Sequence, residues 1–137
     1  MIVDTSAIAA IVLGEPGWVG LSDALWSEQP IIPAPVLTEL NLALWGRGPA
    51  FVSGAAALVE KLAAEGALVA SFEHRHAQLT ASARERYGKG NGRGGLLNFG
   101  DLMVYAIAKD RNEPLLCTGR DFASTDIEIH PASRLDP

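Results

Sequence analysis

Cysteine is scarce in this sequence: its 137 residues include a single one, Cys117. One thiol cannot form an internal disulfide, so the chain has no disulfide framework, which is consistent with the reducing cytoplasm. Cys117 lies in the apolar stretch 114–118, where no adjacent group would activate a thiolate. We therefore expect a buried, non-catalytic thiol in a cytoplasmic protein.

Long hydrophobic runs are also missing. No apolar stretch approaches the roughly 18 residues that a membrane-spanning helix needs. The first residues, Met1–Asp4, carry an acid and no basic residue, unlike the start of a secretory signal peptide. The sequence therefore predicts neither a membrane partner nor a signal peptide.

Positive charge does not predominate. The chain has 16 acidic and 11 basic residues, a formal net charge of −5. Nucleic-acid-binding domains are usually basic, so this balance argues against a generic nucleic-acid binder. The argument depends on whether the acids are spread over the surface or gathered at one site.

Two familiar ligand-binding patterns are absent. His74 and His76 are too close in sequence to clamp one metal ion, and no other His or Cys has a suitable spacing, so we expect both to be solvated. The glycine-rich segment 88–95 lacks the Gly-Lys-Ser/Thr ending of a P-loop. With Lys89 and Arg93 it is predicted to be a flexible basic loop, which serves either as a phosphate guide or as a solvated linker.

What the chain does contain is the composition of a globular domain. Hydrophobic residues make up 48% and charged residues 20%, and the length is near the commonest domain size. We expect a single domain over residues 1–137. Short apolar strands are predicted at 1–4, 31–32, 67–72, 115–118 and 127–129, with helices between them, one of which runs from about Ala77 to Tyr87. This alternation indicates the α/β class with a mostly parallel sheet.

The most informative helix is predicted over residues 97–109. Counted from Asp101, the positions i+3, i+4 and i+7 are Val104, Tyr105 and Ala108, which form an apolar stripe. Asp101 thus shares the face that should be buried. A carboxylate turned inward needs a cation, a metal ion or several hydrogen-bond donors, or it takes up a proton.

Three further acids fall at the ends of predicted elements. Asp4 follows the first strand, Asp121 follows the strand 115–118, and Glu39 lies in a predicted helix beside apolar Val36, Leu42 and Ala43. Open α/β folds build their sites at the carboxyl edge of the sheet, which these positions can reach. Other roles stay open, since Asp4 is able to cap the first helix and Glu39 to lie partly exposed at a helix start.

Four carboxylates at one edge would repel one another without a cation. Ligands that offer only oxygen suit Mg²⁺ or Mn²⁺, ions that also keep water molecules and can activate one against a phosphodiester. Without these four acids, the other 12 nearly balance the 11 basic residues. The acidity is therefore concentrated in the predicted site, and with a divalent ion bound the objection to a nucleic-acid substrate largely disappears.

These residues carry a resemblance to a known family. The motifs Ile-Val-Asp-Thr-Ser-Ala-Ile at 2–8, Leu-Thr-Glu-Leu at 37–40, Asn-Phe-Gly-Asp at 98–101 and Thr-Gly-Arg-Asp-Phe at 118–122 resemble those of the PIN-domain ribonucleases. The closest match within them is to the VapC-type toxins of prokaryotic toxin–antitoxin pairs. The similarity covers essentially the whole chain, with the motifs in the same order.

The resemblance implies a PIN-like α/β/α sandwich with a short, mostly parallel central sheet. It implies an endoribonuclease that depends on Mg²⁺ or Mn²⁺ and acts on RNA. It also implies a homodimer, held inactive by a VapB-like antitoxin whose tail covers the acidic pocket.

Asp4, Glu39 and Asp101 match the family acids directly. Asp121 is our choice for the fourth, with Asp126 as a substitute or helper. The expected roles are direct metal ligands for Asp4 and Asp101, ligand or water-orienting base for Glu39, and ligand through water for Asp121. The hydroxyls of Ser6 and Thr118 are expected to bond to the acids or to the bound water.

Other readings remain at this point. The chain fits a housekeeping RNA-processing PIN nuclease or an inactive PIN-like binding module as well. A phosphotransfer domain fits poorly, because Ser6 stands where a haloacid-dehalogenase-like domain needs a second Asp and Lys109 lies on a predicted helix. Trp18, Trp26 and the apolar stripe 52–63 are candidates for a subunit interface, although we expect most of them in the core.

Overall fold

We describe the chain from a computed structural model, which defines residues 1–136. In chain order its elements are β1 (Ile2–Val3), α1 (Thr5–Leu13), α2 (Trp18–Ser27), β2 (Ile31–Pro33), α3 (Ala34–Trp45), α4 (Pro49–Ala64), β3 (Leu68–Ala70), α5 (His74–Tyr87), α6 (Phe99–Arg111) and β4 (Leu115–Leu116).

The strands form a parallel sheet in the order β3-β2-β1-β4. β1 is central, with Ile2 opposite Ile31 on one side and Leu115 on the other. All strands therefore end at the same edge, and the chain leaves β1 and β4 close together there. The predicted short, mostly parallel sheet is confirmed.

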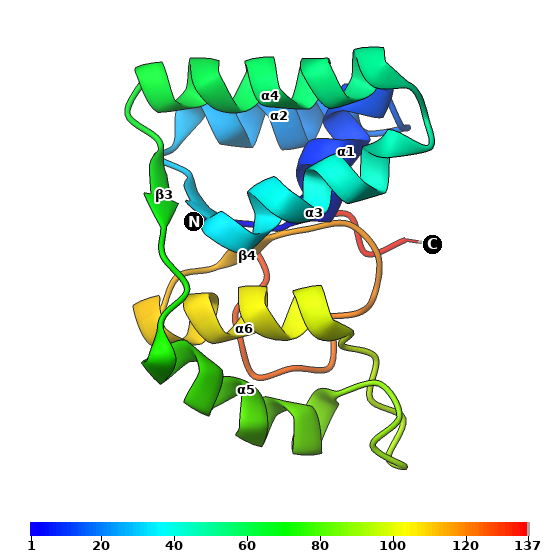
Figure 1. The fold of residues 1–137 in the computed structure, drawn as a ribbon, viewed down its shortest axis with the longest axis vertical. Helices are drawn as coiled ribbons and strands as arrows, with labels where there is room; N and C mark the ends of the chain where they lie inside the picture. Colours follow the sequence, from blue (N-terminus) through cyan, green and yellow to red (C-terminus); the bar gives the residue numbers. More distant parts are fainter. Residues whose placement is uncertain (137) are drawn as a thin grey trace.

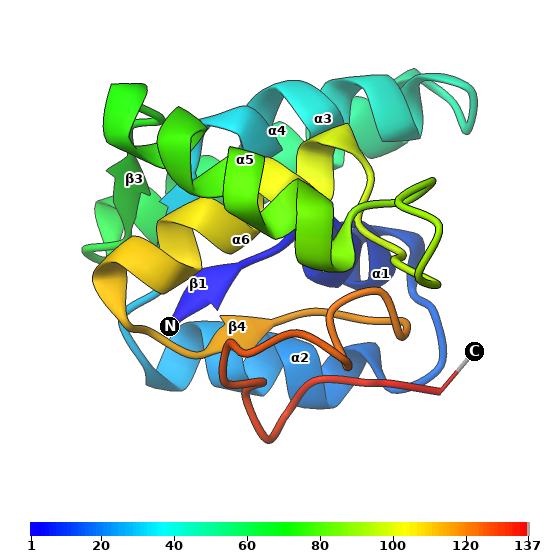
Figure 2. The ribbon, with the colours of Figure 1, turned by 90° about the horizontal axis from the view of Figure 1, so that it is seen from below.

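Helices cover the sheet from both sides (Figure 1). In this view α1, α2, α3 and α4 lie above the central strands, and α6 and α5 lie below them. The same arrangement seen from below shows β1 and β4 between α6 and α2 (Figure 2). The layers are those of an α/β/α sandwich.

The inner face of α6 is part of the hydrophobic core. Val104, Tyr105 and Ala108 are all buried, and Asp101 on the same face is only 7% exposed. The spacing that predicted an inward-facing acid in the sequence is therefore confirmed. Cys117 is buried and free as expected, and burial raises the pKa of its thiol to about 12.

Two predicted elements differ from the structure. Residues 127–129 do not form a strand: Leu115 and Ile129 make an isolated bridge, and Pro131 then has no N–H to continue the ladder. The helix predicted from Ala77 begins instead at His74, where the Glu73 backbone N–H donates to His76 Nδ1 at 2.9 Å and the His76 N–H donates to the Glu73 carbonyl at 3.0 Å, which closes an earlier turn.

The predicted interface candidates are also more exposed than expected. Trp18 and Trp26 are 41% and 46% exposed, while Leu21 and Leu25 on the same helix are buried. In the stripe 52–63, Ala55 and Leu62 are buried, but Ala56 and Ala63 face solvent. Assigning most of these residues to the core was therefore wrong for both tryptophans and for part of α4.

No single helix in residues 1–136 has both the length and the hydropathy of a membrane span. α1 and α2 reach that hydropathy only as a pair, and they are bent by 119° at the break between them.

Candidate metal centre

Asp4 is placed at the sheet edge by β1 and also begins α1. Its backbone N–H donates to the Leu116 carbonyl at 3.0 Å, which fixes it beside the end of β4. Its Oδ2 accepts from the Ser6 N–H at 3.0 Å and from the Ser6 hydroxyl at 2.5 Å. Asp4 is thus the N-cap of α1, the role that its place in the sequence left open.

The second oxygen of Asp4 has no such partner. Oδ1 is buried and makes no hydrogen bond, and the same holds for the Thr5 hydroxyl. Leaving a buried oxygen unpaired costs about 1–3 kcal/mol, and more for a charged group. Capping therefore uses Oδ2 of this carboxylate, and Oδ1 is free to bind a ligand.

Ser6 connects Asp4 to the opposite strand. Its Oγ donates to Asp4 and accepts from the Thr118 backbone N–H at 3.0 Å. The predicted bond between the Ser6 hydroxyl and an acid is confirmed. Thr118 joins this group through its backbone N–H, and the predicted role of its hydroxyl toward the acids or a bound water stays a prediction.

Asp101 is fixed by the start of α6. Asn98 is the N-cap, and its Oδ1 accepts from the Asp101 N–H at 2.9 Å. In return, Asp101 Oδ2 accepts from the Asn98 N–H at 3.0 Å. This reciprocal capping box holds the carboxylate by the backbone itself. We had not singled out Asn98, although an Asn three residues before an Asp is a recognisable N-terminal signal.

Glu39 reaches the same place from α3. A methyl group added at Gly100 would overlap the Glu39 carboxylate, so the two are in close contact. Gly100 is thus the position that lets Glu39 approach α6, a requirement that sequence reasoning missed. The predicted apolar setting of Glu39 is only partly right, because Val36 is buried while Leu42 and Ala43 are exposed.

The acids influence one another electrostatically. Burial raises the pKa of Asp4 to about 6, and the charge of Glu39 adds to the rise. Burial also raises the pKa of Asp101 to about 7, and the charges of Asp4, Asp121 and Glu39 add to it. The structure therefore brings the four predicted acids into one negative field, with Asp121 as the exposed member.

Asp126 belongs to a different cluster. Its Oδ1 accepts from the Tyr105 hydroxyl at 2.6 Å, and its Oδ2 lies 2.9 Å from Lys109 Nζ and 3.6 Å from Arg86 Nη1. The bond from Tyr105 and the two cations lower the pKa of the Asp126 carboxyl. Its charge is already neutralised, which favours Asp121 over Asp126 as the fourth acid.

The hydrogen-bond partners and the chemistry of the carboxylate oxygens indicate whether these residues fit a metal ion. Within residues 1–136, no three His, Cys, Asp or Glu side chains stand ready to ligate one ion. The orphaned Oδ1 of Asp4 and the raised pKa values of Asp4 and Asp101 are nevertheless what a missing cation would relieve. An all-oxygen donor set of this kind fits Mg²⁺ or Mn²⁺.

The histidines provide no ligands here, but His76 is not solvated as predicted. It is 1% exposed, its Nδ1 accepts from the Glu73 N–H at 2.9 Å, and its Nε2 lies 2.9 Å from Asp110 Oδ2. A nitrogen that accepts carries no proton, so Nε2 is the donor to Asp110. His76 is thus a buried link between α5 and α6, whereas His74 is exposed as expected.

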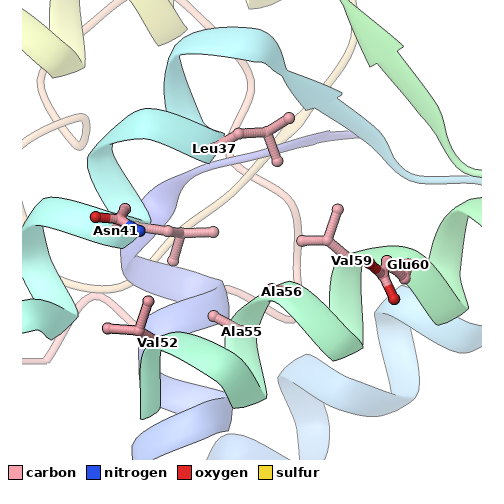
Figure 3. A pocket seen from close by; sticks show the side chains of 8 residues that line it. Leu37, Asn41, Val52, Ala55, Ala56, Val59 and Glu60 are labelled. Carbon is pink, nitrogen blue, oxygen red and sulfur yellow. The ribbon is translucent and has the colours of Figure 1, made fainter. Parts of the chain in front are cut away.

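One recess in the described chain is lined by none of these four carboxylates. It is a mainly apolar groove between α3 and α4 (Figure 3). Its lining consists of Leu37, Leu40, Asn41, Val52, Ala55, Ala56, Val59 and Glu60. Leu37, Leu40 and Asn41 stand within two residues of Glu39, so the groove runs past the helix that carries this acid.

Comparison with known proteins identifies the family of this chain. A family model described as the PIN domain matches residues 1–128. The chain belongs to the PIN-domain family. It is 43% identical to ribonuclease VapC36 of Mycobacterium tuberculosis over 133 residues, which are 94% of this chain and 92% of that protein. This degree of identity places it among the VapC ribonucleases of the PIN family.

Solved structures show the same PIN fold. VapC20 of Mycobacterium tuberculosis, described as a sarcin-ricin loop cleaving toxin, superposes with a TM-score of 0.67 at 22% identity, over 95% of this chain and 98% of its own. A chain of VapBC2 from Rickettsia felis, bound to a fragment of promoter DNA, gives 0.63 at 16% identity, over 98% and 96%. At these identities the likeness concerns the fold alone.

Proposed function

We infer that the chain is an endoribonuclease and acts as the toxin of a VapC-type toxin–antitoxin pair. The family membership supports the ribonuclease activity, and the single observation that supports the site is the buried Oδ1 of Asp4, which has no partner. We further propose that residues 1–137 are one nuclease domain that works in the cytoplasm.

We propose that the site holds Mg²⁺ or Mn²⁺. Asp4 and Asp101 would be the direct ligands, with Glu39 as a ligand or water-orienting base and Asp121 as a ligand through water. When bound, the ion would neutralise these carboxylates, activate a water and stabilise charge on the phosphodiester oxygens. The proposal is supported by the mutual effect of these acids on the pKa values of Asp4 and Asp101.

The chain's own groups would orient this chemistry. Ser6 occupies one oxygen of Asp4 and leaves the other free, so the direction of the free lone pairs is set. Asn98 holds Asp101 at the start of α6. Glu39 is only half-buried, which leaves its carboxylate open to a water that enters from solvent.

We propose a VapB-like antitoxin as the inhibitory partner. The support is that solved neighbours of this fold are toxin–antitoxin complexes, and that the mainly apolar groove of Figure 3 is lined in part by α3, the helix that also carries Glu39. A segment bound there would reach the acidic pocket with its adjoining residues.

We also propose a homodimer. The support is the exposure of three large apolar side chains on α3 and at the start of α6: Phe99, Leu42 and Trp45 are 80%, 72% and 73% exposed. A second copy would remove this apolar surface from water. Equilibrium sedimentation of the purified chain measures the assembly directly.

The experiment that tests the activity is cleavage of total RNA by the purified chain with Mg²⁺ or Mn²⁺. We expect cutting that stops with EDTA and in the Asp101→Asn variant. A wild-type chain that cuts nothing, or a variant that cuts as well as wild type, would overturn the proposed site. Cleavage that persists in EDTA would overturn the metal requirement alone.

A further inference from the structure

The glycine-rich segment 88–95 is more ordered than the flexible loop that its composition predicts. Lys89 N–H donates to the Leu97 carbonyl at 2.8 Å, and Leu97 N–H donates to the Tyr87 carbonyl at 3.0 Å, which closes the loop at its base. Leu97 is 1% exposed, so this base is anchored in the core. The loop is therefore attached firmly to the body of the protein.

Asn91 organises the middle of the loop. Its Oδ1 accepts from the Arg93 N–H at 2.8 Å and from the Gly95 N–H at 3.1 Å. Its Nδ2 donates to the Glu85 carbonyl at 3.1 Å, on the last turns of α5. One side chain thus ties both arms of the loop to the preceding helix.

The glycines serve this shape in two ways. Gly90, Gly92 and Gly94 have φ of +82°, +73° and +78°, a region that other residues rarely adopt, and nothing lies within 4 Å of a Cβ placed there. Gly95 is different, because a Cβ there would collide with the Gly88 carbonyl. The loop is tight at its base and open to solvent along its outer side.

This open side carries positive charge. Lys89 and Arg93 are exposed, and neither takes part in the ion pairs found among residues 1–136. Their location contrasts with the nearby acids, because the loop leads through Leu97 directly to Asn98 and Asp101. Both ribbon views place it on the side of the molecule where α6 starts (Figures 1 and 2).

We propose that the loop 88–95 is a phosphate-binding arm for the RNA substrate, with Lys89 and Arg93 as its contacts and Asn91 as a positioning residue. The inference rests on the proposed ribonuclease function and deepens it. A polyanionic substrate that approaches four carboxylates needs compensating cations, and a preordered loop supplies them without the entropic cost of ordering it. Contacts to phosphates position a nucleic acid and do not read its bases.

The test compares Lys89→Ala and Arg93→Ala with Arg111→Ala. Arg111 is an exposed cation at the far end of α6, ten residues from Asp101 and therefore roughly 15 Å along the helix axis. Each variant changes the net charge equally. Steady-state cleavage of a fluorophore–quencher RNA oligomer in Mg²⁺ or Mn²⁺, repeated over a range of salt concentrations, gives kcat, KM and the salt dependence.

We expect each loop variant to raise KM about three- to tenfold with little change in kcat, and to reduce the slope of log KM against log salt by about 0.7. The cleavage sequence should not change. Asn91→Ala should raise KM as well, with a melting temperature close to that of wild type. Arg111→Ala should do neither.

Several outcomes would overturn the proposal. One is an equal rise in KM for Arg111→Ala, which would mean a diffuse charge effect. Another is that Lys89→Ala and Arg93→Ala leave KM and its salt dependence unchanged. The proposal also fails if these two variants weaken only the complex with an antitoxin. Because these results require a wild-type enzyme that cleaves RNA, they differ from a failure of the ribonuclease function itself.

Discussion

Asp101 lies on α6 and Asp126 is bonded to α6, but the two carboxylates have opposite electrostatic surroundings. Asp101 is buried among other acids, and its pKa is raised to about 7. Asp126 accepts a hydrogen bond from Tyr105 and pairs with Lys109, and its pKa is lowered. The cost of holding the Asp126 charge is offset within the chain, whereas the cost of the Asp101 charge is not. Asp101 is therefore the acid that we expect to bind a cation from outside the chain, whereas Asp126 is not.

The largest expected difference between the two acids is in cleavage. Asp101→Asn should lower kcat by about 100-fold or more, because loss of a metal ligand forfeits several kcal/mol of charge stabilisation. Asp126→Asn should cleave RNA at nearly the wild-type rate. The two variants are measured side by side with total RNA and Mg²⁺, and equal losses in both would end the distinction between the clusters.

Gly100→Ala should have the next largest effect. The added methyl group overlaps the Glu39 carboxylate and must displace it, so we expect roughly tenfold slower cleavage by misplacement of a reacting group. Gly20→Ala is the matched control, since Gly20 lies within α2 and has nothing within 4 Å of a new Cβ. If both variants cleave alike, Glu39 does not act at this position.

The comparison also predicts opposite effects on stability. Without metal at pH 8, Asp126→Asn should lower the free energy of unfolding by about 1 kcal/mol, because a charge-assisted network at a partly exposed site is lost. Asp101→Asn should leave it unchanged or raise it, since a buried repulsive charge is removed. Urea unfolding in EDTA measures both free energies. A marked destabilisation by Asp101→Asn would contradict the inference that the Asp101 charge is not offset by a cationic side chain among the described residues.

The raised pKa values also make the stability of the metal-free protein depend on pH. An aspartate has a pKa of about 3.9 when unfolded, below the values of about 6 and 7 for Asp4 and Asp101 in the fold. Between pH 4 and 7 the unfolded chain therefore binds fewer protons than the folded one, so these groups make the metal-free protein less stable as pH rises. At about 1.4 kcal/mol per pKa unit, the change should be at most on the order of 3 kcal/mol for Asp4 and 4 kcal/mol for Asp101.

Thermal unfolding in EDTA between pH 4 and 8 follows this loss. The slope should be shallower in Asp101→Asn, and adding Mg²⁺ or Mn²⁺ at pH 8 should raise the melting temperature of wild type but not of the variant. The same slope in both proteins would show that Asp101 does not titrate as described.

How far the sequence predicts this molecule depends on the range of the interactions involved. The inward turn of Asp101 followed from a period of 3.6 residues, and the meeting of Asp4 with the start of α6 followed from parallel strands that share an edge. Both are local patterns repeated along the chain. The fold class and the grouping of the acids were therefore within reach.

The errors concern contacts between distant segments. The buried ring of His76 finds its hydrogen-bond acceptor in Asp110, which lies 34 residues further on. The exposure of Leu42 was missed because apolar residues lie all around α3, so its sequence does not tell which side faces the core. The order of the glycine-rich loop depends on one Asn91 side chain, and composition alone predicts only flexibility there.

The hydrogen bond between Thr118 and Ser6 joins residues that are 112 positions apart, and Asp4 donates to Leu116 in the same region. A chain still emerging from the ribosome has Asp4 from the beginning but lacks both partners until translation is nearly finished. The orientation of Asp4 is therefore completed only after β4 has been made and has docked. The carboxylate group around Asp4 is therefore complete only when synthesis of the chain is almost finished.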